Sequence, residues 1–164
     1  MQATKKNQQG MMLLEALLGI LIFSLAVLAL VAMASTAVTV QADAQFRSDA
    51  MKLAQHISSE IWTGVDRTTE VVGGVKMSVV TAASLQQFQH KATGGSCAFT
   101  GAASARSEVT DWVASVQNIL PGSSDAMQQI IVNPAINNQV FITICWRAPA
   151  DNQTRHYTLA TYVN

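Results

Sequence analysis

A long apolar run from Met11 to Val40 constrains the fold of this chain more than any other feature. Its only charged side chain is Glu15, and the 25 residues from Ala16 to Val40 contain neither a charge nor a proline. A helix needs about 20 apolar residues to cross the hydrocarbon core of a bilayer. The run therefore predicts a membrane-spanning helix.

The ten residues before the run are polar and carry the charge that orients such a helix. They include Lys5 and Lys6 and no acidic residue. Because positive charge is retained on the cytoplasmic side, we expect a cytoplasmic N-terminus and a periplasmic C-terminal part. The run is much longer than the core of a secretory signal peptide. A conventional cleavage site near Ala34, which would release a soluble C-terminal part, is the alternative.

Glu15 is the unusual residue of the run, because a carboxylate in hydrocarbon is costly unless it has a partner. Two interpretations follow from the residues alone. Glu15 either lies at the membrane interface, where the positive end of the helix dipole favours it, or it is paired inside the apolar region.

The start of the run resembles a known signal. Gly10, two apolar residues, then Leu13, Leu14 and Glu15 ahead of the apolar run are similar to the class III signal of type IV pilins and pseudopilins. The chain differs from most members in having Met11 where phenylalanine is usual. The resemblance implies that a prepilin peptidase cuts between Gly10 and Met11 and that Met11 is N-methylated. It also implies that Glu15 carries the charge used in subunit assembly, paired with the α-amine of an adjacent subunit.

Two cysteines, Cys97 and Cys145, fall in the part predicted to be periplasmic, where disulfides persist. We predict one disulfide between them, and two unrelated buried thiols are the alternative. A metal site is not expected. The chain has no CxxC motif, and His56, His90 and His156 show no ligand spacing with either cysteine.

The charge balance gives no indication of a nucleic-acid partner. The whole chain has ten basic and ten acidic side chains, and removal of residues 1–10 would leave eight basic and ten acidic. This slightly acidic balance lacks the basic footprint of a nucleic-acid-binding protein.

After Val40, apolar residues recur at helical spacing among polar ones. They are Ala42, Phe46, Ala50, Leu53, Ala54, Ile57 and Ile61. We expect one helix from about Met12 to Trp62, ending at Gly64. Its membrane half is 11–40, and its amphipathic half, 41–63, needs a sheet or helices to cover the apolar stripe.

The remaining residues, 64–164, predict a folded head. Gly73-Gly74 is a turn between valine-rich strands within 71–80. Residues 84–90 form a short helix or a loop, 93–96 a loop, and 101–107 an exposed segment. The range 107–120 reads as a helix capped by Ser107, with Trp112 on its apolar, core-facing stripe.

Three strands follow in the last forty residues. The alternating pattern of 139–147 predicts a half-buried strand between strands at 128–133 and 154–163. These make an antiparallel meander, with His156 expected on its solvated face. Composition alone supports an α+β class. The pilin resemblance implies the pilin fold, in which the long N-terminal helix packs on the C-terminal antiparallel sheet.

The C-terminal half extends the resemblance to the PilV group of minor pilins. It rests on the helix ending in LPG, the strand ending in ICWR and the terminal segment RHYTLATYV. This implies a subunit of the inner membrane and then of the cell-surface pilus. Its partners would be other minor and major pilins, the prepilin peptidase and the pilus assembly platform. Its roles would be pilus biogenesis, adhesion or twitching motility.

Enzyme motifs are missing from the sequence. It contains no nucleophile elbow, no HExxH and no phosphate-binding glycine loop, so we expect no enzyme and no cofactor. Two alternatives to the minor pilin are kept. One is a pseudopilin of type II secretion, and the other is a membrane-anchored binding head.

Overall fold

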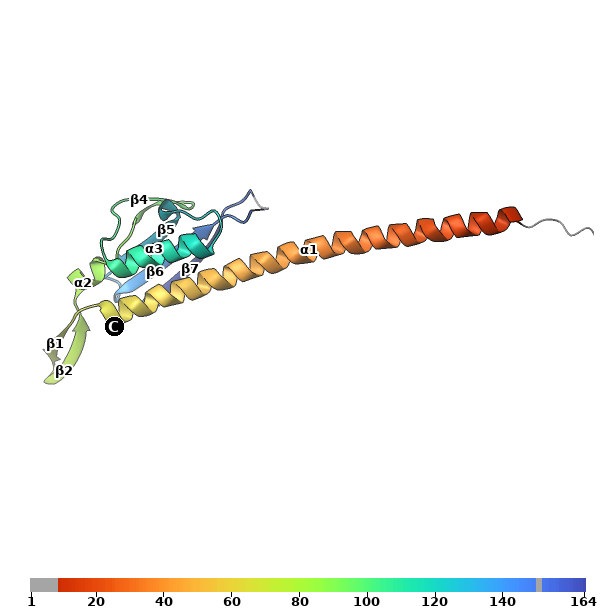
Figure 1. Cartoon of the computed structure of the whole chain (residues 1–164). Helices are drawn as coiled ribbons and strands as arrows, with labels where there is room; N and C mark the ends of the chain where they lie inside the picture. The colour runs from red at the N-terminus through yellow and green to blue at the C-terminus, as the bar shows by residue number, and fades with distance from the viewer. Residues whose placement is uncertain (1–8, 150–151) are drawn as a thin grey trace, which may run out of the picture. The chain divides into compact units, whose positions relative to one another are not determined.

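The computed structural model describes residues 9–149 and 152–164. Its contacts divide the chain into a unit that ends at Ala42 and a second unit, Asp43–Asn164. Helix α1 (Gln9–Gly64) contributes to both (Figure 1). The prediction of one long N-terminal helix is thereby confirmed. Residues 1–8, most of the expected leader, lie outside the described residues.

Two arginines hold the C-terminal end of α1. The last carbonyls of a helix have no partner within it and attract cations. The Arg67 Nη1 donates to the carbonyl oxygen of Trp62 over 2.9 Å, and the Arg106 Nη2 donates to that of Gly64 over 3.4 Å. Two of the terminal carbonyls thus have hydrogen-bond donors from outside the helix.

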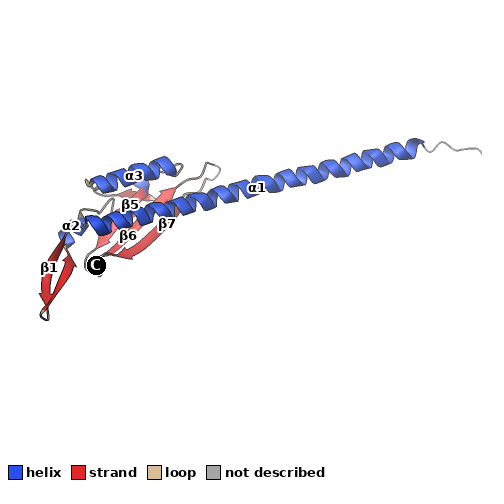
Figure 2. Cartoon of the chain, turned by 60° about the horizontal axis from the view of Figure 1, so that its bottom comes forward, coloured by secondary structure: helices blue, strands red, loops and turns tan. Residues whose placement is uncertain are grey.

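The second unit contains a three-stranded antiparallel sheet in the order β5 (Gln128–Asn133), β6 (Gln139–Trp146) and β7 (Arg155–Tyr162) (Figure 2). The expected meander is confirmed. On β6, Val140, Ile142 and Ile144 are fully buried on one face, as the alternating pattern predicts.

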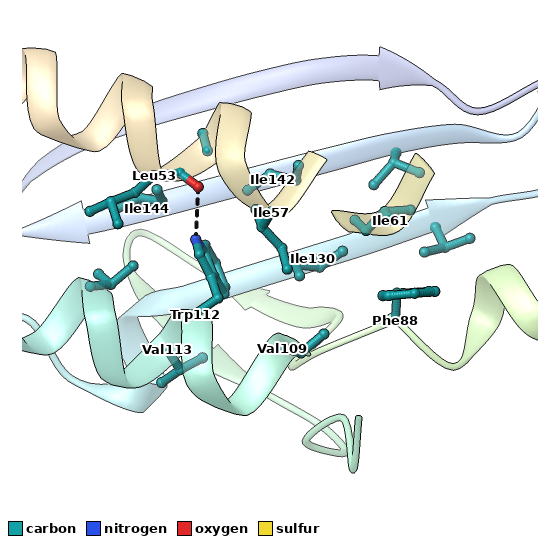
Figure 3. Packing of buried hydrophobic residues seen from close by; sticks show 14 of the residues in the cluster. Leu53, Ile57, Ile61, Phe88, Val109, Trp112, Val113, Ile130, Ile142 and Ile144 are labelled. Atoms are coloured by element: carbon teal, nitrogen blue, oxygen red, sulfur yellow. Dashed lines mark hydrogen bonds between the residues drawn. The ribbon is translucent and has the colours of Figure 1, made fainter. Parts of the chain in front are cut away.

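The residues of α1 that belong to the second unit and helix α3 (Ser107–Ile119) cover that face of the sheet. Figure 3 shows Ile57 and Ile61 of α1 pointing toward Ile130 and Ile142 of the strands. Trp112 is 2% exposed, and its Nε1 donates to the Leu53 carbonyl oxygen over 3.0 Å. The α+β layout and the core position of Trp112 are confirmed.

Smaller elements complete the head. A hairpin joins β1 (Arg67–Val72) to β2 (Val75–Val80) through Gly73 and Gly74, at φ +61° and +83°. A two-residue turn of this kind needs positive φ at both positions, which glycine adopts without strain. The other elements are α2 (Ala82–Gln86), β3 (Thr93–Gly95), β4 (Ala98–Thr100) and the 3-10 turn η1 (Asp125–Met127).

Two local expectations were wrong, and a third was wrong at one residue. Residues 93–95 form strand β3 rather than a loop, because a tight turn at Ser96-Cys97 folds them back onto β4. Ser107 is the first helical residue of α3 and not its cap, since Arg106 holds that position without a capping side-chain bond. Most of the segment 101–107 is exposed as expected, but Ser104 is buried and donates to the Gln87 carbonyl oxygen over 2.6 Å.

Ile57→Ala tests whether the apolar stripe of α1 stabilises the head. Ile57 is 0% exposed, so removing three carbons should lower the free energy of unfolding by about 2–5 kcal/mol through lost burial and a cavity. The matched control is Ile136→Ala, because Ile136 is 54% exposed and should change stability by at most about 0.5 kcal/mol. Urea unfolding of the full chain in detergent micelles measures both, and equal effects would contradict the assignment.

Candidate functional site

The apolar half of α1 is a candidate membrane and assembly surface. From Met11 to Val40, every residue whose side chain is described is exposed. Phe23, for example, is 70% exposed and Leu13 is 68% exposed. Within the described residues, α1 is the one helix long and apolar enough to cross a membrane. An exposed apolar surface of this length is typical of a membrane or protein-interaction surface.

Polar groups inside this half fit a low-dielectric environment. The Ser24 Oγ donates to the Ile20 carbonyl oxygen one turn earlier, over 2.7 Å. The hydroxyl is thus satisfied within the helix, which is what a hydrocarbon environment would require.

Among the described residues, Glu15 has no such partner. It lies exposed on α1, and among the described residues no cation is placed within 4.0 Å of it. Gly10 and Met11 lie one turn before it on the same helix, so the three residues of the predicted processing and assembly site share a short helical segment. The cleavage, the methylation and the assembly role stay predictions.

The predicted disulfide is present between Cys97 and Cys145, with an S–S distance of 2.01 Å. Cys145 lies on β6 and is fully buried, and Cys97 forms part of the turn between β3 and β4. Ser96 and Cys97 both have positive φ, at +53° and +63°, a conformation that costs non-glycine residues free energy. The cross-link therefore holds this turn against the sheet.

Sequence reasoning missed a buried histidine that faces an ion pair. His90 is 3% exposed, its Nδ1 accepts from the backbone N–H of Ser104 over 3.3 Å, and its Nε2 lies 3.3 Å from the Asp125 Oδ1. The Lys91 Nζ lies 2.8 Å from the other carboxylate oxygen of Asp125. Burial lowers the pKa of His90 below 6.5, although the Asp125 carboxylate opposes the shift. A lone histidine followed by a lysine gives no signal from which this cluster is predictable.

Arg106 organises a second polar cluster. Its guanidinium lies over the Phe88 ring, 4.1 Å from the centroid, and its Nη2 lies 2.6 Å from the Glu108 Oε1. These hydrogen bonds from Arg106 lower the pKa of Glu108 to about 2. Since Arg106 also donates to Gly64, this cluster joins α3 to the end of α1 and is structural in character.

The described part of the head has few clusters of side chains that could bind a ligand or a metal ion. Within residues 9–149 and 152–164, no three His, Cys, Asp or Glu side chains are grouped to hold a metal ion. His156 is exposed, as expected, on the face of β7 opposite to the helices.

Comparison of the chain with protein-family models, curated proteins and solved structures finds no match.

The buried His90 predicts a pH-dependent stability. Because its pKa is lower in the folded chain than the ordinary 6.5, the unfolded chain takes up the proton first as the pH falls. The free energy of unfolding should therefore decrease below about pH 6.5, by at most about 1.4 kcal/mol per pH unit.

Urea unfolding of the full chain at several pH values between about 7.5 and about 5 measures this slope, because this range brackets the ordinary histidine pKa. His90→Gln should flatten the slope, whereas His156→Gln, at an exposed position, should keep it. An unchanged slope in His90→Gln would show that another group causes the effect.

Proposed function

We propose that the chain is a minor type IV pilin of the PilV type, inserted in the inner membrane and then incorporated into type IV pili or used to start or cap them. The observation that carries the proposal is the exposed apolar half of α1, with its single carboxylate Glu15 following Gly10 at the spacing of the class III signal.

The form of the head supports the same proposal. A disulfide-bonded α+β head built on the amphipathic half of an N-terminal helix has the layout that the pilin resemblance implies. The disulfide suits an oxidising compartment such as the periplasm. The proposed topology, with a cytoplasmic N-terminus and a periplasmic head, rests on Lys5 and Lys6.

In this proposal Glu15 sets the depth at which a subunit docks. Cleavage after Gly10 creates an α-amine on Met11, and N-methylation leaves that amine cationic. In a filament, apolar helices exclude water, and an unpaired carboxylate among them is costly. A subunit whose Glu15 meets the α-amine of its neighbour neutralises both charges, whereas a mismatched subunit leaves both unpaired.

A pseudopilin of type II secretion shares this N-terminal segment and is the competing assignment. The two assignments differ in which assembly, the pilus or the secretion system, loses its function when the subunit is missing. Deletion of the gene should abolish or reduce surface pili and twitching while protein secretion continues. Loss of secretion with normal pili would assign the chain to the secretion system instead.

Processing by the peptidase is the first test. Co-expression with a prepilin peptidase should remove residues 1–10, which intact-mass spectrometry detects directly. Gly10→Val should block the cut, because a side chain at that position obstructs a closely fitting active site. The control Met11→Phe, which introduces the usual residue, should be cut like the wild type. An unshortened wild-type chain, or normal cleavage of Gly10→Val, would contradict the pilin assignment.

Glu15→Ala tests the assembly role separately. Insertion, cleavage and the disulfide should be intact, while recovery of the protein in sheared pili, or pilus number, should fall. Glu15→Gln should behave like Glu15→Ala, because it keeps the shape and removes the charge. The control Glu70→Gln removes one carboxylate from the exposed strand β1 and should have no effect. Immunoblots of sheared pili and membranes measure the outcome, and wild-type levels of Glu15→Ala in pili would leave Glu15 as an interfacial residue.

A further inference from the structure

The β1–β2 hairpin is a sheet of two strands that has no third strand among the described residues. Figure 1 and Figure 2 both show it extending away from the sheet of β5, β6 and β7. Three of its apolar side chains are largely exposed, Val71 at 64%, Val75 at 62% and Met77 at 52%. A hairpin of two strands is at best marginally stable in water. A further strand would therefore stabilise it.

The register of the hairpin gathers the apolar residues of β2 on one face. Successive residues of a strand alternate between the two faces of the sheet. Val75, Met77 and Val79 therefore lie on one face, and Lys76 and Ser78 lie on the other. A stripe of three apolar side chains thus runs along β2 without a charge among them.

The glycine turn determines which backbone groups of β2 face the open edge. In a hairpin with a two-residue turn, the residues that flank the turn form a hydrogen-bonded pair, and the pairs alternate from there. Val75 and Met77 therefore direct their N–H and C=O groups toward β1. Lys76 and Ser78 direct theirs to the open edge, where a further strand can pair with them.

The outer edge of β1 is less suited to a further strand. β1 contains Arg67 and Glu70, and charged side chains on an edge strand oppose pairing with another chain. Arg67 is also engaged elsewhere, because its Nη1 donates to the Trp62 carbonyl oxygen. β2 contains a single charged residue, Lys76, so its edge is the one more open to pairing.

The strand β2 is complementary to itself in one antiparallel register. If Met77 lies opposite Met77 of a second copy, Val75 lies opposite Val79 in both directions, and Lys76 lies opposite Ser78. The residues that direct backbone groups to the open edge then meet one another, as an antiparallel ladder requires. A shift that sets Lys76 opposite itself places like charges together, which is destabilising. A shift the other way moves the second copy toward the buried end of β2.

We propose that two copies of the chain pair through the open edges of β2 and form a four-stranded antiparallel sheet across a twofold axis. A twofold contact uses the same surface on both copies, which is what a self-complementary strand provides. Four strands with a shared apolar face meet the requirement that two strands do not. One short strand edge is small compared with the interfaces of about 1,000 Å² that bind stably, so the dimer should be reversible and need raised protein concentration. The inference is independent of the proposed function.

Disulfide trapping of the full chain in detergent micelles tests the contact. The native cysteines are joined to each other, so an introduced cysteine is the free thiol of each variant. On mild oxidation, Met77→Cys should form a linked dimer, because directly opposite residues have Cα atoms within disulfide range. The control Val71→Cys is at least as exposed, lies on β1 and does not meet itself, so it should stay monomeric on a non-reducing gel.

A mixture of two variants tests the register. Lys76→Cys and Ser78→Cys should each link poorly when oxidised alone, and they should link to each other when the two proteins are mixed before oxidation. Self-linking of Lys76→Cys as strong as that of Met77→Cys, or linking of Val71→Cys to the same extent, would overturn the assigned pairing.

Sedimentation equilibrium in density-matched micelles measures the dimer without an introduced thiol. Met77→Lys should weaken dimerisation at least about tenfold, because it removes an apolar pair and sets like charges opposite each other. Met51→Lys makes the same change at a 40% exposed position on α1 and should leave the dimer intact. A wild-type chain that is monomeric at every concentration, or a dimer that Met77→Lys does not weaken, would overturn the inference.

Discussion

The packing of one helical stripe against one face of the sheet is the contact on which the head depends. Ala50, Ala54, Ile57 and Ile61 are fully buried, and strands β5 and β6 supply the residues that cover them. Each of the two buried isoleucine side chains contributes about 1.5–3 kcal/mol. The three-stranded sheet is too small to bury its own apolar face, so it needs α1 and α3. Because the same helix carries the exposed apolar run, the head and its proposed membrane anchor share one continuous element.

On the opposite side of the head, a disulfide bond adds stability where little apolar area is buried. Near Cys145 the sheet is covered by the β3–β4 hairpin, a short element that contains two glycines and a strained Ser96-Cys97 turn. Phe99 of β4 is the large apolar side chain that this short segment buries. The disulfide spans 48 residues, and on the chain-entropy model closing a loop of that length contributes about 4 kcal/mol. The cross-link thus compensates for a hairpin that packing alone would stabilise poorly.

Elements with strong periodicity were predictable from the sequence. The stripe of α1, the alternation of β6 and the Gly73-Gly74 turn each follow from local pattern, and the structure contains all three. The position of Trp112 was predictable for the same reason, because it lies on the apolar stripe of a short helix. The two cysteines also paired as expected, since the choice of partners was limited to one.

Features that depend on distant residues were not predictable. The pairing of Thr93–Gly95 with β4 contradicts the low strand propensity of a Thr-Gly-Gly segment and requires the turn that Cys97 holds against β6. Ser104 is buried because Gln87 and His90, far earlier in the chain, supply its hydrogen-bond partners. The cluster of His90, Lys91 and Asp125 brings together residues that share no motif. In each case the tertiary contact, and not the local sequence, decides the environment.

Because charged residues are few in this chain, the position of each one matters for its interactions. Only 12% of residues are charged, and Met11–Val40 contains a single charged side chain. An exposed pair such as Lys52 and Asp49, 3.2 Å apart on α1, contributes little because water screens it. The same charge in hydrocarbon interacts several times more strongly, since the Coulomb energy rises as the dielectric constant falls. Selectivity in the proposed assembly therefore depends on where the few charges lie, and above all on Glu15 near the start of the apolar run.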